Sequence, residues 1–172
     1  MKIVVLKFGG TSVGTIEKIK KVTDIIIEHK KKKNKVIVVS SAMSGVTNDL
    51  IKKSKQISNN FIDSEYDVLV SSGEQVACSL IAGRLNHKGF KSRSWLGWQI
   101  PIFTNGPYTN SRIQQVNKNK LLRFLKEGGI PIITGFQGVN MNERVTTIGR
   151  GGSDASAIMI AKSFKAQRCI IY

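Results

Sequence analysis

The chain has 172 residues, 41% of them hydrophobic, and it carries 27 Lys and Arg against 11 Asp and Glu, for a formal net charge of +16. This length and apolar content predict one globular domain, over residues 1–172, and exclude an intrinsically disordered chain. Because the sequence shows neither an apolar run long enough for a membrane span nor a signal peptide, we expect a cytoplasmic protein without a membrane partner.

The first elements predict a parallel crossover unit. Residues 2–7 are a continuous apolar run, typical of a strand buried on both faces. A helix follows, capped by Thr11, Ser12 or Thr15, with apolar residues at helical spacing. Residues 35–40 predict a second buried strand. Two parallel strands joined by a helix form a right-handed crossover.

A block of lysines, Lys30–Lys33 with Lys35, separates that helix from the second strand. No aromatic side chain that could stack on a nucleic-acid base interrupts it. We interpret the block as a solvated turn and expect no specific nucleic-acid partner. Attraction of small anions stays open as an alternative, and nucleic-acid binding is the least favoured interpretation.

The remaining elements continue the alternation of strands and helices. We expect, in order, a helix ending near residue 55, a polar loop over 54–60, a helix over 66–85 that a glycine interrupts, strands near 92–96 and 100–104, a helix over 115–126, a strand over 130–135, a hairpin over 138–147, a helix over 153–165 and a strand over 168–172. Cys78 and Cys169 match no metal or redox spacing, so both are predicted to be reduced core residues.

Four junctions carry small or charged residues, at positions 7–12, 40–47, 71–75 and 149–154. Three of them directly follow predicted strands. Since ligands of open parallel sheets bind outside the carboxyl ends of the strands, we expect these junctions to meet at one site.

The first junction reads Lys7-Phe8-Gly9-Gly10-Thr11-Ser12. Glycines allow backbone N–H groups to approach an anion, and a lysine beside them can reach phosphate oxygens. The spacing matches neither GxxxxGK[ST] nor GxGxxG. A tight turn with a lysine at its edge is the alternative.

The other junctions offer groups for a polar ligand. Arg150 presents a planar fork that suits a carboxylate, whereas Ser153 and Asp154 are also good helix caps. Glu74 lies in an apolar helical segment, where a carboxylate is costly unless it is paired; an exposed position is its alternative. The hydroxyls of the segment from Ser41 to Thr47 can donate to a substrate or to the loop's own backbone.

Four segments, KFGGTSV, SSAMSGVTN, SSGEQ and TTIGRGGSD, resemble those of the aspartate kinase family, in the same order and with similar spacing. The resemblance implies the amino-acid kinase fold, a three-layer α/β/α sandwich with a mostly parallel central sheet, incomplete at its C-terminal side. It further implies transfer of the ATP γ-phosphoryl group to the β-carboxylate of L-aspartate, the first step towards lysine, threonine, methionine and diaminopimelate.

The same resemblance implies a role for each candidate site residue. Lys7 and Asp154 are expected to be catalytic, with Asp154 orienting the lysine or the substrate ammonium. ATP phosphates are expected at Lys7, Phe8, Gly9 and Gly10. L-aspartate is expected at Ser41, Thr47, Glu74, Arg150, Ser153 and Asp154, with Arg150 on its α-carboxylate and Glu74 on its α-ammonium. Mg²⁺ is expected to be held mainly by ATP phosphates, with no dedicated protein metal site.

The chain departs from the family by ending at Tyr172. The expectation is an N-terminal portion of the catalytic domain, without a regulatory domain or most of the nucleotide half, and therefore inactive alone. A homodimer, or association with a separately encoded C-terminal segment, stays open. Two alternatives are a catalytically dead remnant that binds aspartate or a partner chain, and another amino-acid kinase.

Overall fold

Five parallel strands form the central sheet, in the order β3-β6-β2-β1-β9. The computed structural model describes residues 2–172. These strands are β1 (Ile3–Phe8), β2 (Lys35–Ser40), β3 (Ser92–Trp95), β6 (Ile130–Thr134) and β9 (Arg168–Ile171). Because all five run in one direction, their carboxyl ends meet at one edge of the sheet, where the predicted junctions also lie.

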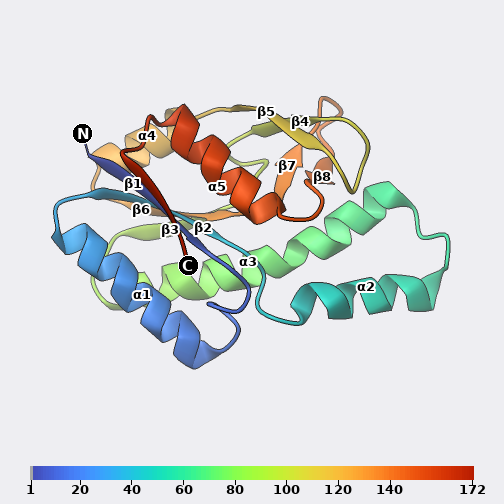
Figure 1. Ribbon diagram of the computed structural model, residues 1–172, viewed down its shortest axis with the longest axis horizontal. Helices are drawn as coiled ribbons and strands as arrows, with labels where there is room; N and C mark the ends of the chain where they lie inside the picture. Colours follow the sequence, from blue (N-terminus) through green and yellow to red (C-terminus); the bar gives the residue numbers. More distant parts are fainter. Residues whose placement is uncertain (1) are drawn as a thin grey trace.

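Helices cover both faces of this sheet (Figure 1). They are α1 (Ile16–Lys31), α2 (Val46–Ile57), α3 (Asp63–His87), α4 (Asn119–Lys126) and α5 (Gly152–Ser163). The helices α1 and α3 lie on one side, and α4 and α5 lie on the other. In Figure 1, α2 lies beside the first half of α3 and extends away from the sheet.

Strand β1 contributes side chains to two hydrophobic cores, one on each face of the sheet. Val4, Leu6 and Phe8 belong to the apolar cluster that includes residues of α1 and α3, whereas Ile3 and Val5 belong to the cluster that includes residues of α4 and α5. Successive side chains of a strand point to opposite faces, so an unbroken apolar run is required here. The predicted three-layer arrangement with a mostly parallel sheet is confirmed.

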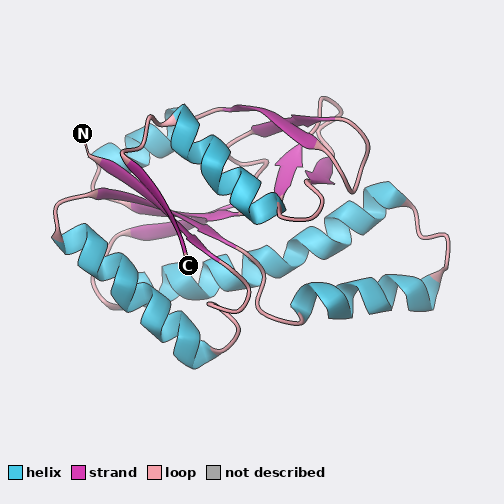
Figure 2. Cartoon of the chain, viewed as in Figure 1, coloured by secondary structure: helices cyan, strands magenta, loops and turns pink. Residues whose placement is uncertain are grey.

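A second, four-stranded sheet has the order β5-β4-β7-β8 (Figure 2). Its strands are β4 (Ile102–Asn105), β5 (Arg112–Val116), β7 (Gln137–Val139) and β8 (Val145–Thr147). The β7–β8 hairpin confirms the prediction. Strand β5 was not predicted, and the predicted start of α4 at residue 115 is wrong. The segment is polar and mostly exposed, and its strand conformation depends on antiparallel pairing with β4.

Three smaller predictions have mixed outcomes. Thr15 is confirmed as the cap of α1, since its Oγ1 accepts from the backbone N of Lys18 at 3.3 Å. The loop predicted over residues 54–60 is partly wrong, because α2 continues to Ile57. Cys78 is buried as predicted, but Cys169 is exposed, because it lies on the edge strand β9.

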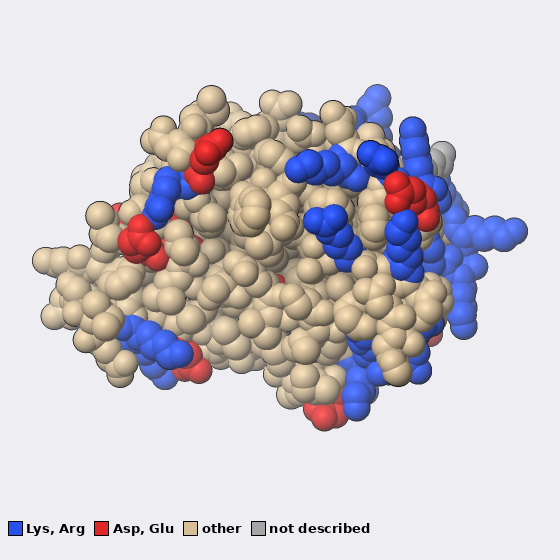
Figure 3. Space-filling view, turned by 180° about the vertical axis from the view of Figure 1, so that it is seen from behind, with Lys and Arg blue, Asp and Glu red and all other residues tan. Residues whose placement is uncertain are grey.

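The lysine block lies between α1 and β2, as predicted, but only Lys32 and Lys33 form the turn. Lys30 and Lys31 end α1, and Lys35 begins β2. Turns that lead into parallel strands lie at their amino ends, so the block lies at the opposite end of the sheet from the junctions. In Figure 3, Lys and Arg side chains gather on the right, which corresponds to the left of Figure 1. Within residues 2–172, no helix combines the length and apolar character that crossing a membrane requires.

Candidate functional site

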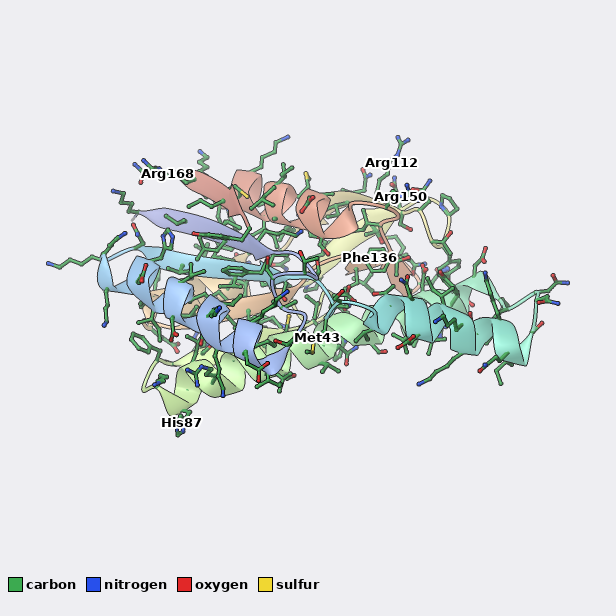
Figure 4. All side chains as sticks on the ribbon, turned by 60° about the horizontal axis from the view of Figure 1, so that its bottom comes forward. Met43, His87, Arg112, Phe136, Arg150 and Arg168 are labelled. Carbon is green, nitrogen blue, oxygen red and sulfur yellow. The ribbon has the colours of Figure 1, made fainter. Side chains whose placement is uncertain are left out.

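A cavity of about 660 Å³ opens at the carboxyl ends of β1 and β2, between the starts of α2 and α5. Its volume lies in the range of small-molecule sites. Figure 4 shows Met43, Phe136 and Arg150, three of its lining residues from separate loops, far from His87 and Arg168 at the other end of the molecule. Eight of the predicted site residues line the cavity: Lys7, Gly10, Ser41, Thr47, Glu74, Arg150, Ser153 and Asp154.

Lys7 and Asp154 meet at this cavity from opposite ends of the sequence. Lys7 is the only charged residue of β1 and is 8% exposed, and its Nζ lies 2.7 Å from Oδ1 of Asp154 in the first turn of α5. The contact holds the ammonium group in one place although little water surrounds it. Among residues 2–172, Arg150 makes no ion pair, so its guanidinium is available to a ligand.

The glycine turn after β1 uses its two glycines differently. The N–H of Gly9 donates to the carbonyl of Tyr172 at 3.1 Å, and the buried ring of Phe8 stacks on the Tyr172 ring, with centroids 4.9 Å apart. Gly10 faces the cavity, and a Cβ there would lie 3.1 Å from the carbonyl oxygen of Ala42. A phosphate contact from the Gly9 N–H would therefore require its present hydrogen bond to open, whereas Gly10 already lies at the cavity.

Glu74 is a buried carboxylate with one oxygen left free. Oε1 accepts from the backbone N of Ala42 at 3.1 Å, and Oε2 has no hydrogen-bond partner among residues 2–172. Burial raises the pKa of Glu74 to about 7. The neighbouring Gly73 allows this arrangement, because a Cβ there would lie 2.9 Å from the Ala42 Cβ and would displace the loop. A buried carboxylate of this kind is suited to an ammonium ligand.

A second buried carboxylate, Asp67, was missed by the sequence reasoning. It accepts from the backbone N of Thr109, and from the N and Oγ1 of Thr147 at 2.8 and 2.6 Å. Thr109 and Thr147 line the cavity, so Asp67 fixes two of its walls to α3. Its signal in the sequence was its place seven residues before Glu74, which puts both acids on one helical face.

The starts of two helices open into the cavity. Gly45 caps α2 and Gly151 caps α5, with φ of 86° and 75°, values that favour glycine over other residues. Ser153 lines the cavity and packs closely against Gly135. A Cβ at Gly135 would lie only 2.8 Å from the serine Oγ, so a larger residue there would displace Ser153. Helix starts favour anions, as do Lys7 and Arg150.

The cavity therefore combines groups for anions with one buried acid that suits a cation. This combination fits a zwitterionic ligand next to a phosphate group. No three His, Cys, Asp or Glu side chains of residues 2–172 are grouped to hold a metal ion.

Residues 2–172 match the Amino acid kinase family. The aspartokinase of Geobacillus stearothermophilus is 47% identical over 172 residues, which are 100% of this chain and 42% of that protein. The structure of E. coli aspartokinase III in complex with aspartate and ADP superposes with a TM-score of 0.87 at 25% identity, over 99% of this chain and 49% of that one. The aspartate kinase from Synechocystis gives 0.84 at 38% identity, over 98% of this chain and 28% of that one. This chain thus spans less than half the length of these relatives.

Proposed function

The chain belongs to the amino acid kinase family, and we propose that it carries the aspartate-binding and phosphate-facing part of an aspartate kinase. In this reaction the γ-phosphoryl group of ATP is transferred to the β-carboxylate of L-aspartate. The observation that supports it best is the cavity in which the Lys7–Asp154 pair, the free fork of Arg150 and the half-bonded carboxylate of Glu74 face one space. The similar E. coli enzyme forms a complex with aspartate and ADP.

Each end of an aspartate molecule has a complementary group in the cavity. Arg150 binds the α-carboxylate through a two-pronged contact, and Glu74 binds the α-ammonium. The hydroxyls of Ser41, Thr47 and Ser153 donate further hydrogen bonds to the α-carboxylate. This assignment leaves the β-carboxylate of the substrate free to approach Lys7.

The proposed chemistry requires charge neutralisation more than proton transfer. The β-carboxylate has an ordinary pKa near 4 and is already ionised at neutral pH, so the nucleophile needs no general base. Lys7 neutralises the charge that spreads over the transferring phosphoryl group, and Asp154 keeps the Lys7 ammonium in position. The N–H groups at the start of α5 and the backbone of Gly10 complete the anion-binding wall.

Mg²⁺ belongs to this proposal as a companion of ATP. The residues of the cavity fit such a role and do not fit a dedicated metal cage, since Asp154 is engaged by Lys7 and Glu74 by Ala42. Bound to the phosphates, the ion would supply further charge neutralisation. Oxygen atoms of ATP and water would be its main ligands.

Calorimetry with L-aspartate tests the substrate assignment, with L-glutamate and D-aspartate as controls. We expect saturable binding of L-aspartate, at least tenfold tighter than that of either control. Tighter binding of L-glutamate would instead favour another amino-acid kinase, and no binding of any of them would overturn the proposal. Trapping of aspartyl phosphate with hydroxylamine, in the presence of ATP and Mg²⁺, then tests catalysis. In a longer chain that has activity, Lys7→Ala should reduce turnover far more than it raises the KM for aspartate.

A further inference from the structure

A second hollow, of about 590 Å³, lies between the edge strand β3 and helix α4. It is lined by Arg93, Trp95, Trp98, Gln99, Lys120, Arg123, Phe124 and Glu127, and shares none of them with the site cavity. Both tryptophans of the chain are among them. We call it the tryptophan hollow. Nothing in the proposed kinase reaction uses it.

Aromatic rings form the apolar part of the tryptophan hollow. Trp95 is almost fully buried and meets Phe124 edge to face, with ring centroids 5.9 Å apart. Trp98 is 49% exposed. An indole that is half open to water beside a hollow offers a face on which a planar ring can stack. The buried Nε1 of Trp95 has no acceptor among residues 2–172.

Cations surround these rings. The guanidinium carbon of Arg93 lies 4.0 Å from the Trp95 ring centroid, and the Nζ of Lys120 donates to the carbonyl of Gln99 at 3.0 Å. Both contacts restrain long side chains, so a ligand would find them already ordered. In Figure 3 a group of Lys and Arg side chains around an acidic one occupies the upper right, the side on which α4 lies.

The single acid of the hollow does not cancel this charge. Glu127 is bound by Lys91 at 2.7 Å and by Arg123 at 3.4 Å, contacts that lower its pKa. Arg93 has no carboxylate within ion-pair distance in the described part of the chain. Its guanidinium edge is therefore free to bind an anion while its face rests on Trp95.

From this arrangement we infer that the tryptophan hollow binds a small anion carried on a planar aromatic ring. The ring stacks against Trp98, and the carboxylate or phosphate is held by Arg93 and Lys120. An alternative explanation for Arg93 is that charged residues on an edge strand prevent unwanted strand pairing. This explanation covers Arg93 and no other residue of the hollow. It accounts neither for an exposed tryptophan beside it nor for the cations that α4 contributes.

Intrinsic fluorescence tests this inference directly, because both tryptophans of the chain lie in the hollow. The protein is titrated with adenosine monophosphate and with phenylacetate, which separate a nucleotide from an aromatic carboxylate, and with inorganic phosphate and acetate as anions without a ring. We expect saturable quenching by at least one aromatic anion, with a Kd at least tenfold below that of its ring-free counterpart. Equal affinities, or no saturable change with either aromatic probe, would overturn the inference.

Two variants then locate the binding. Arg93→Gln and Trp98→Ala change exposed side chains, and each should raise the Kd at least fivefold. Lys53→Gln removes an exposed cation on α2 and serves as the control, with no change expected beyond twofold. If Arg93→Gln and Trp98→Ala both leave the Kd unchanged, or if the control weakens binding as much as they do, the hollow is not the site. Because the proposal does not depend on kinase activity, the result is independent of the aspartate titrations.

Discussion

Asp67 and Glu74 lie on one face of α3, two turns apart, and both are buried carboxylates. They differ in how completely they are hydrogen-bonded. Asp67 accepts from three donors in two other segments, whereas Glu74 accepts from one loop N–H, and its Oε2 has no partner in the described part of the chain. Burying a charge is costly, and hydrogen bonds offset that cost only where they are made.

The difference separates a structural role from a binding role within a single helix. A carboxylate with several donors stabilises the fold and offers little to a ligand. A carboxylate with one free oxygen at a cavity wall is destabilising until a cation arrives, and burial raises the pKa of Glu74. Four substitutions test this contrast.

Asp67→Ala should have the largest effect on stability. The change leaves the buried N–H of Thr147, its hydroxyl and the Thr109 N–H without their acceptor, so we expect a loss of about 3–5 kcal/mol in the free energy of unfolding. Urea unfolding measures it. Asp63→Ala, an exposed position in the first turn of the same helix, is the matched control. A loss below about 1 kcal/mol for Asp67→Ala would remove the distinction between the two acids.

Glu74 should make the stability of the protein fall as the pH rises. Its folded-state pKa of about 7 lies above the ordinary value of 4.5, so the folded state binds the proton more tightly than the unfolded state does. Stability contributed by the protonated group is therefore full below about pH 4.5 and is lost as pH rises through about 7. This loss is on the order of 3 kcal/mol.

Unfolding of Glu74→Gln between pH 4.5 and 8 measures that loss. The variant should lack the decline and exceed the parent in stability at pH 8, while binding L-aspartate at least tenfold more weakly. Glu28→Gln, on an exposed face of α1, serves as the control. Parallel pH profiles for the parent and Glu74→Gln would contradict the raised pKa.

Arg150→Lys should weaken aspartate binding by about 1–3 kcal/mol and leave unfolding unchanged. Like Glu74, Arg150 has no ion-pair partner in the described chain, but it is exposed, so water solvates its charge and the substitution costs little stability. Calorimetry measures the change, with Arg123→Lys on α4 as the control. Unchanged affinity would argue against Arg150 as the carboxylate clamp.

Thr147→Val has the smallest expected effect. It removes the 2.6 Å bond from Oγ1 to Asp67 but keeps the backbone N–H bond, so about 1 kcal/mol of stability should be lost. Thr109→Ser is the comparison, because Thr109 hydrogen-bonds to Asp67 through its backbone N–H. Chemical denaturation of both variants decides whether the Thr147 hydroxyl adds to what the backbone N–H groups already provide.

Local patterns were enough to predict most of the fold. The apolar runs at residues 2–7 and 35–40 can be accommodated only as strands covered on both faces, and the periodic segments between them predict the covering helices. Strand β5 escaped prediction because its polar residues acquire strand conformation from pairing with β4. Tertiary packing also decides the course of α3. Gly73 suggested a break in this helix, but the helix continues through it, and the glycine packs against Ala42 and Val46.

The sequence by itself determined which residues could form the site, since the strand-end segments are local and a parallel sheet brings them to one edge. Only the tertiary structure decided how these residues are used. It pairs Lys7 with Asp154, directs the Gly9 N–H to Tyr172, encloses Asp67 among three donors and leaves Glu74 half-bonded. These outcomes depend on contacts between segments far apart in the chain, and a local pattern of residue types contains no information about which partner a buried polar group will meet.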